Sequence, residues 1–306
     1  MQRSLSELYS DPKFPGSFSG AAHFYREAKA LNPQLTRGQV TEFLASKSSY
    51  FLHKPRRKPK KYRRTLVSGI NDLWQIDLMD MQKFKRQNSG YRYVCVIIDC
   101  FSKYVWLKPI KNKTGQSIVK ALALLLMTER PKLIQADQGT EFFNKKVSKM
   151  LEAFGPKLYH TFSDKKASIV ERVQRTIRMR LGRMFTENGD KKWIDKCADI
   201  ADSYNNSYHR SIKMKPADVT KQHTEIIYKR LFPSTPLEKA KFKLFDKVRL
   251  RRKKTFMEKE YTPKWSEEIY TIKRVKRTNP VTYNLIDPSN LDVKGSLYTE
   301  ELQHAS

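Results

Sequence analysis

The stretch LWQIDLMDMQKFKRQNSGYRYVCVIIDCFSKYVWLKPI, residues 73–110, decides the fold. Three runs within it, LWQIDLMDM, YRYVCVIIDC and YVWLKPI, are rich in aromatic and β-branched residues and predict three consecutive strands. The link between the first two runs contains Asn88, Ser89 and Gly90, which favour a turn. The stretch therefore predicts a meander of three strands.

Helical and strand patterns alternate after this meander. Helices are expected over 115–129, 140–154, 168–185 and 191–209, with short strands over 132–137 and 157–162 between the first three. A meander followed by such alternation predicts an α/β fold over residues 70–212, with a mixed five-stranded sheet and helices on its faces.

Two smaller parts flank this predicted core. Residues 1–52 predict a helical N-terminal module with helices over 21–31 and 36–47, the second preceded by Thr36 as a candidate N-cap. Such a helix pair could be a DNA-binding helix-turn-helix or a docking module. Prolines in 213–240 predict a linker, and the short strand patterns in 241–306 predict an SH3-like barrel.

Positive charge dominates the composition. The chain of 306 residues carries 61 Lys and Arg against 31 Asp and Glu, a formal net charge of +30. A field of this sign concentrates polyanions, so nucleic acid is the expected partner. An anionic membrane is the competing partner, but the most apolar run, ALALLLM at 121–127, is far too short to span a bilayer.

The charge is densest in two segments. Eight of the twelve residues in HKPRRKPKKYRR, 53–64, are Lys or Arg, and residues 53–69 predict an extended basic linker. This linker is expected to bind DNA phosphates and to act as a nuclear-import signal, which places the protein in the nucleus. The barrel opening, 241–254, also contains eight Lys or Arg. The candidate DNA-binding residues of these segments are Arg56, Arg57, Lys60, Lys61, Arg251, Arg252, Lys253 and Lys254.

Cysteine and histidine usage predicts neither a disulfide framework nor a zinc site. Cys95, Cys100 and Cys197 are scattered, and Cys95 and Cys100 fall in a predicted strand, where buried and inert thiols are expected. The histidines show no ligand spacing. In the barrel, Tyr261, Trp265 and Tyr270 could form core or, less often, an aromatic cage for a methyl-lysine peptide.

Three carboxylates occupy unusual positions. Asp77 lies in the middle of a predicted strand, where aspartate is disfavoured. Asp137 ends another strand, and ligands collect at the carboxyl ends of strands in α/β sheets. Glu171 lies near the start of the helix SIVERVQRTIRMRLGRMF, opposite its apolar stripe. Taken singly, each has an ordinary explanation, which for Glu171 is an exposed pair with Arg175 one turn on.

Taken together, the three acids have the spacing of the DDE phosphotransferases. The chain resembles retroviral-type integrases, and most closely the integrases of Maverick/Polinton DNA transposons, over about residues 70–303. The matching segments occur in the family's order: LWQIDLMDM, YVCVIIDCFSKYVWLKPIK, ADQGTEFFNKKV, KKASIVERVQRTIRMRL, YNNSYHRSIKMKPADV and TPKWSEEIYTIKRV.

This resemblance implies an RNase H-like core in which Asp77, Asp137 and Glu171 jointly hold two divalent cations, Mg²⁺ or Mn²⁺. Hard oxygen ligands suit these ions, and two of them can promote in-line displacement at phosphorus. The implied activity is cleavage of double-stranded DNA and transfer of 3′ ends, carried out by a homo-oligomer on element ends and target DNA, with chromatin as a further partner. Four basic residues next to Glu171 are expected to contact phosphates: Lys165, Lys166, Arg175 and Arg178.

The sequence departs from the family in places. Gln174 stands where the family usually has Asn, and the barrel opens with Phe245-Asp246 where a Gly-Asp turn is common. The zinc-binding N-terminal domain of retroviral integrases is absent. Two alternatives follow: a domesticated DNA- or chromatin-binding protein without catalysis, and an RNase H-like nuclease that cleaves without joining.

Overall fold

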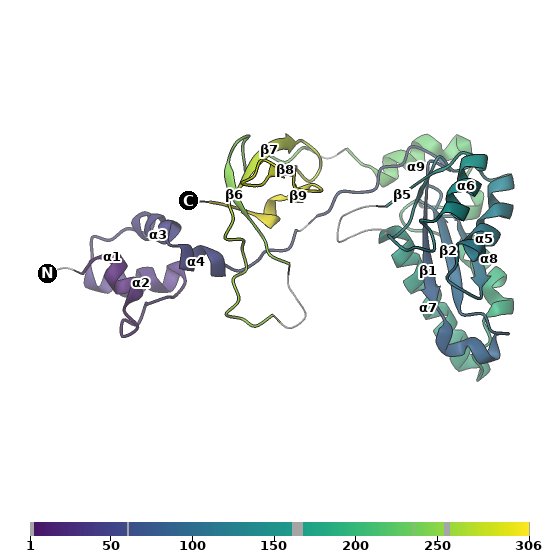
Figure 1. The fold of residues 1–306 in the computed structure, drawn as a ribbon, viewed down its shortest axis with the longest axis horizontal. Helices are drawn as coiled ribbons and strands as arrows, with labels where there is room; N and C mark the ends of the chain where they lie inside the picture. The colour runs from purple at the N-terminus through teal and green to yellow at the C-terminus, as the bar shows by residue number, and fades with distance from the viewer. Residues whose placement is uncertain (1–2, 60, 161–167, 235, 254–257, 306) are drawn as a thin grey trace. The chain divides into compact units, whose positions relative to one another are not determined.

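The computed structural model describes residues 3–59, 61–160, 168–234, 236–253 and 258–305 (Figure 1). The chain divides into two compact units. Residues 65–234 form the first, which we call the core unit. The described residues of 1–64 and 235–306 form the second, which we call the flanking unit. No described helix is both long enough and apolar enough to cross a membrane.

A mixed five-stranded sheet forms the centre of the core unit, as predicted. Its strands are β1 (Leu73–Asp80), β2 (Tyr93–Asp99), β3 (Val105–Ile110), β4 (Leu133–Gln135) and β5 (Lys157–Tyr159). They lie in the order β3-β2-β1-β4-β5, with the first three antiparallel and the last three parallel. The predicted meander is therefore confirmed, and its first turn uses left-handed backbone at Ser89 and Gly90.

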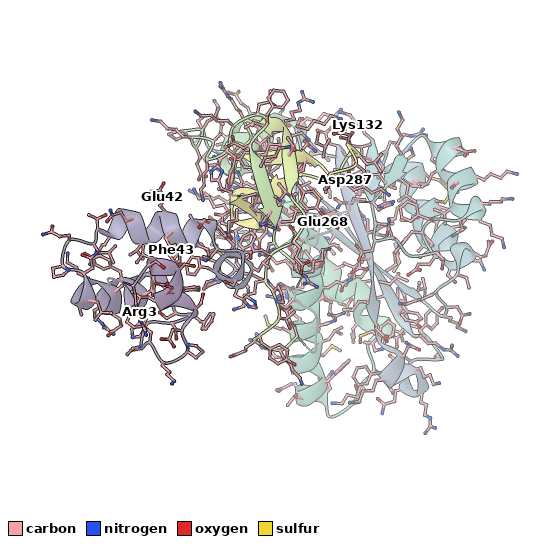
Figure 2. All side chains as sticks on the ribbon, turned by 60° about the vertical axis from the view of Figure 1, so that its left-hand side comes forward. Arg3, Glu42, Phe43, Lys132, Glu268 and Asp287 are labelled. Carbon is pink, nitrogen blue, oxygen red and sulfur yellow. The ribbon has the colours of Figure 1, made fainter. Side chains whose placement is uncertain are left out.

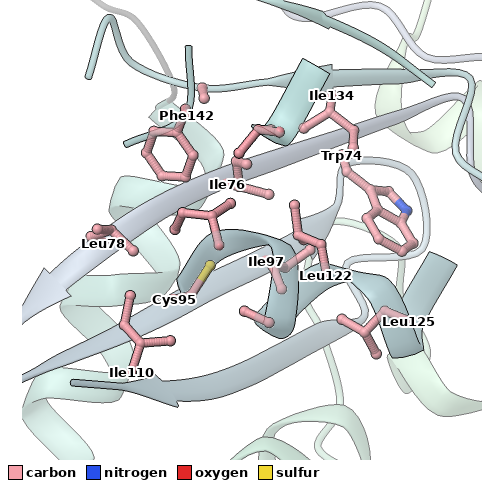
Figure 3. Packing of buried hydrophobic residues seen from close by; sticks show 14 of the residues in the cluster. Trp74, Ile76, Leu78, Cys95, Ile97, Ile110, Leu122, Leu125, Ile134 and Phe142 are labelled. Atoms are coloured by element: carbon pink, nitrogen blue, oxygen red, sulfur yellow. The ribbon is translucent and has the colours of Figure 1, made fainter. Parts of the chain in front are cut away.

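Helices cover both faces of this sheet (Figure 1). They are α5 (Gly115–Thr128), α6 (Lys145–Phe154), α7 (Ser168–Asn188), α8 (Cys197–Asn205) and α9 (Thr224–Leu231). Trp74, Ile76 and Leu78 of β1 pack against α5 and α6 (Figure 3), whereas Met79 packs in a separate cluster with α7 and α8. Because side chains alternate along a strand, Asp77 shares the α7 face with Met79.

Three elements of the core unit differ from the prediction. The helix expected over 191–209 spans only Cys197–Asn205. The helix expected over 140–154 begins at Lys145, because the side chain of Asn144 accepts the backbone N–H groups of Lys146 and Val147. The segment 213–240, predicted to be a linker, contains α9, whose Ile227 is fully buried in an apolar cluster. Pro216 contributed to the prediction of a linker, but in the structure it begins a short 3-10 helix. Proline is tolerated at the first position of a helix.

Short 3-10 helices connect several elements. They span Gln82–Gln87, Ile194–Lys196, Pro216–Asp218, Lys221–His223 and Thr299–Glu301.

The flanking unit begins with four helices: α1 (Leu5–Ser10), α2 (Ala21–Leu31), α3 (Arg37–Ser46) and α4 (Ser48–His53). The two predicted helices are present, and Thr36 caps α3 by accepting the N–H of Gln39 at 3.3 Å. Phe43 is labelled in Figure 2. Its ring centroid lies 6.0 Å from those of Tyr9 and Phe24. The short helices α1 and α4 are additional to the prediction.

An antiparallel five-stranded sheet completes the flanking unit. Its strands are β6 (Lys247–Leu250), β7 (Tyr270–Lys276), β8 (Thr282–Ile286), β9 (Leu297–Tyr298) and β10 (Leu302–His304), in the order β10-β6-β7-β8-β9. Val248, Ile272 and Tyr283 are buried at its centre. The sheet contains the predicted strands and one more, β10, which pairs with β6.

Candidate active site

The three predicted acids come from three neighbouring elements of the core unit. Asp77 lies in β1, Asp137 follows the end of β4, and Glu171 lies in the first turn of α7. β1 and β4 are parallel neighbours, with Gln75 directly opposite Gln135. Each aspartate therefore follows the paired glutamine of its strand by two positions.

Asp77 is the acid most affected by its surroundings. Burial raises the pKa of its carboxyl group above the usual value, and the negative charges of Asp137 and Glu171 raise it further. Two hydrogen bonds oppose this effect: the N–H of Leu78 donates to Oδ1 at 2.8 Å, and the Gln174 amide donates to Oδ2 at 2.9 Å. Asp137 and Glu171 thus both lie within electrostatic reach of Asp77.

Asp137 carries an unsatisfied oxygen. Its Oδ1 is buried and has no hydrogen-bond partner among the described residues, and its backbone carbonyl accepts the N–H of Gly139 at 2.7 Å in a tight turn. A buried carboxylate oxygen without a donor is costly unless a cation satisfies it. Together with the like charges around Asp77, this oxygen suits a hard divalent cation.

No closed metal cage exists in the part of the chain that the structure describes, where no three His, Cys, Asp or Glu side chains are grouped to hold an ion. The three cysteines, Cys95, Cys100 and Cys197, are buried and form no disulfide, and burial raises the pKa of each thiol to about 12.

The acids can still suit Mg²⁺ without a closed cage. Mg²⁺ commonly binds through one or two carboxylates and keeps several waters, so an open set of acids fits this ion.

The surface of α7 beside the acids is basic. Glu171, Gln174, Arg175, Arg178 and Met179 line a shallow depression of about 400 Å³. Arg178 donates to Gln174 Oε1 at 3.2 Å, and Glu171 and Arg175, both described, form no ion pair. The ordinary explanation of Glu171 as a partner of Arg175 therefore finds no support in the geometry.

Gln174 connects the acids to this basic surface. It is buried, and its side chain donates to Asp77 while accepting from Arg178. The Gln174 side chain, which is one methylene longer than Asn, thus connects Asp77 to Arg178. Sequence analysis identified the residue as a departure but not its two contacts.

The basic residues of the flanking unit fall into two groups. Arg56 forms a two-pronged ion pair with Glu258, at 2.6 and 3.2 Å, and Arg251 pairs with Glu301 at 3.0 Å. Arg57 is exposed, as are Arg252 and Lys253, and Lys61 forms an exposed pair with Glu238 at 3.5 Å. Four predicted DNA-binding residues lie outside the described residues: Lys60, Lys165, Lys166 and Lys254.

The basic linker packs on the C-terminal part of the flanking unit. Trp265 donates from Nε1 to the carbonyl of Lys54 at 2.9 Å, and Arg251 donates to the carbonyl of Arg57 at 3.2 Å. Trp265 is only 4% exposed, so it is not available to line an aromatic cage. These hydrogen bonds hold the linker to this unit at Lys54 and Arg57.

Sequence analysis missed two residues next to the acids, Gln75 and Gln135. Both amides are buried and hydrogen-bonded to each other at 3.1 Å. The available signal was a polar residue two positions before an aspartate in each of two otherwise apolar strands.

Comparisons with known proteins agree with this architecture. The family model described as "Integrase core domain" matches residues 68–165, a range that ends before Glu171. A transposon-derived protein of Caenorhabditis elegans is 31% identical over 196 residues, which cover 62% of this chain and 65% of that protein. The Pro-Pol polyprotein of simian foamy virus type 3 is 32% identical over 134 residues, 42% of this chain and 11% of the polyprotein.

The chain thus spans less than two thirds of the length of these relatives. Among solved structures, a chain of the simian T-cell lymphotropic virus intasome superposes with a TM-score of 0.65 at 14% identity, over 90% of this chain and 94% of the other. That similarity concerns the fold alone. Residues 68–165 are therefore similar to the integrase core domain, and the chain is similar to transposon-derived and retroviral Pol proteins.

Proposed function

We propose that this protein is a DNA integrase or transposase-like recombinase that cleaves phosphodiester bonds and transfers 3′ ends into double-stranded DNA. This proposal rests on three carboxylates in a region similar to the integrase core domain. Burial raises the pKa of Asp77, and the charges of Asp137 and Glu171 raise it further. One buried oxygen of Asp137 has no hydrogen-bond partner among the described residues. The order of matching motifs supports the Maverick/Polinton subtype within this class.

Asp77, Asp137 and Glu171 would hold two Mg²⁺ or Mn²⁺ ions. When bound, such ions activate an attacking oxygen and stabilise the leaving oxygen in an in-line displacement. The chain's own residues prepare the site: the Leu78 N–H and the Gln174 amide fix the carboxylate of Asp77. Arg175 and Arg178, on the exposed face of α7, would bind phosphates of the DNA.

The flanking unit would supply DNA affinity that does not depend on sequence. Its exposed cations include Arg57 on the basic linker and Arg252 and Lys253 just after β6. We propose that the sheet containing β6 is an SH3-like barrel. The net charge of +30 favours contact with DNA phosphates. The same basic linker supports a nuclear location, and transfer of two ends supports a homo-oligomer that works on DNA or chromatin.

A strand-transfer assay on the purified chain tests this proposal. With Mg²⁺ or Mn²⁺ and a labelled duplex carrying a recessed 3′-hydroxyl end, we expect joined products that EDTA abolishes. Nicks without joined products would instead identify a nuclease.

A second candidate is a DNA- or chromatin-binding protein without catalysis. It is favoured by the Gln174 contact on Asp77 and by the lack of a closed three-ligand group among the described side chains. Tight duplex binding with neither nicking nor joining in either metal would select this candidate.

A further inference from the structure

Gln75 lies at a buried polar junction between the three elements that carry the acids. It belongs to β1, two residues before Asp77, and its side chain contacts both β4 and the start of α7. Gln75 is 0% exposed and Gln135 is 3% exposed. Water therefore does not compete for these hydrogen bonds, and the amide atoms depend on one another.

The first contact caps α7. Gln75 Oε1 accepts the backbone N–H groups of Ile169 and Val170, each at 3.0 Å. N–H groups in the first turn of a helix have no acceptor within that helix. Here a strand side chain supplies the acceptor, so the beginning of α7 is fixed to β1. Glu171 is the next residue along α7.

The second contact fixes β4. Gln75 Nε2 donates to Gln135 Oε1 at 3.1 Å, and the two residues are direct partners in the β1–β4 ladder. Asp137 follows Gln135 by two residues. The amide group of Gln75, which precedes Asp77 by two residues, thus contacts Gln135 before Asp137 and Val170 before Glu171.

We propose that Gln75 is a positioning residue for the acid triad. It sets the location of Glu171 relative to Asp77 through the start of α7, and it holds the strand that leads to Asp137. Without its oxygen, two helix N–H groups lose their acceptor, so the first turn of α7 shifts and the spacing of the carboxylates changes. The inference rests on the proposed function, because it assumes that the three acids bind metal.

Mn²⁺ binding to the full chain tests this role without any activity measurement. Free Mn²⁺ is followed by electron paramagnetic resonance during titration at low temperature. Gln75→Met is similar in size but has no acceptor, and it should weaken Mn²⁺ binding about 10- to 100-fold, the usual effect of losing a residue that orients metal ligands. Gln75→Glu keeps an acceptor at the helix start but cannot donate to Gln135 Oε1, so it should lose less Mn²⁺ affinity than Gln75→Met does.

Asn205 provides a matched control. Its buried side chain joins α8 to β3 through both the N–H and the carbonyl of Val105, at 2.8 and 2.9 Å. Asn205→Leu should lower the melting temperature, as Gln75→Met does, and leave Mn²⁺ affinity unchanged. Equal loss of Mn²⁺ binding in both variants would show a general structural effect and overturn the inference.

Two further variants, Gln75→Asn and Asp77→Asn, distinguish a failure of this inference from a failure of the proposed function. Should Gln75→Met not fold, Gln75→Asn, one methylene too short to keep all its contacts, replaces it; unchanged Mn²⁺ affinity in that variant contradicts the inference. Mn²⁺ binding that is lost in Asp77→Asn but kept in Gln75→Met overturns the inference alone. Mn²⁺ binding that does not depend on Asp77 overturns the proposed function and the inference with it.

Discussion

The core unit and the flanking unit use charge in opposite ways. In the core unit, three acids lie on three elements, and buried amides such as Gln75 and Gln174 fix their surroundings. In the flanking unit, many cations are exposed and several are already paired with acids. The proposed site of chemistry thus depends on a few atoms in fixed places, whereas the proposed DNA affinity depends on a sum of interchangeable charges. Single substitutions should therefore have large effects in the first unit and small ones in the second.

The largest effect is expected for neutral replacements of the aspartates. Asp77→Asn or Asp137→Asn removes one charged ligand of the proposed metal site. Such a ligand is worth about several kcal/mol of transition-state stabilisation, so 3′-end joining should fall on the order of 10³-fold. The double variant should be little worse, because the acids act as a unit. Gel analysis of joined products gives the rates, and metal-free duplex affinity should stay equal or rise. A double variant whose losses multiply would mean that the acids act independently.

Next in size is the ion pair that holds the basic linker. The side chains of Arg56 and Glu258 are 16% and 7% exposed, so Arg56→Met leaves a nearly buried carboxylate without its two-pronged partner. We expect the flanking unit to lose about 2 kcal/mol of unfolding free energy, measured by urea denaturation.

Lys61→Met is the matched control for this pair, since the side chains of Lys61 and Glu238 are 69% and 52% exposed. It should leave the unfolding free energy unchanged. Equal effects of both substitutions would show that the linker is not held by the Arg56 contact.

Smaller effects are expected for the exposed cations. Arg57→Ala or Arg252→Ala should weaken binding to all duplexes alike and reduce the slope of log K against log salt by about 0.9 for each lost phosphate contact. Fluorescence anisotropy at several salt concentrations measures the slope. A loss of affinity for one DNA sequence only would indicate base recognition. It would contradict the view that the cations of the flanking unit are interchangeable.

The smallest effect concerns stability and pH. Because burial and the neighbouring acids raise the pKa of Asp77, protonated Asp77 favours the folded state, and this stabilisation is lost as pH rises through the folded pKa. Asp77→Asn should therefore raise the melting temperature of the metal-free protein at neutral pH. The difference should shrink as pH falls below the ordinary aspartate range. A gain that persists at acidic pH would exclude this electrostatic origin.

Sequence periodicity predicted most of the fold because the strands of residues 73–110 and the helices over 21–31 and 168–185 have strong apolar patterns. The spacing of the acids likewise placed Asp77, Asp137 and Glu171 on adjoining elements. What it missed depends on partners distant in the chain. Gln75 meets Gln135 and Ile169 only in the folded sheet, and Arg56 meets a residue 202 positions away.

The most direct test compares two glutamates of the same helix. Glu171 and Glu187 are both exposed on α7, but only Glu171 lies near the other acids. The assay is 3′-end joining on a pre-nicked duplex in Mg²⁺ and in Mn²⁺, with metal-free duplex binding followed in parallel. We predict that Glu171→Gln loses joining by orders of magnitude in both metals while binding is kept, and that Glu187→Gln joins like the wild type. Full joining activity in Glu171→Gln would contradict the assignment of the triad.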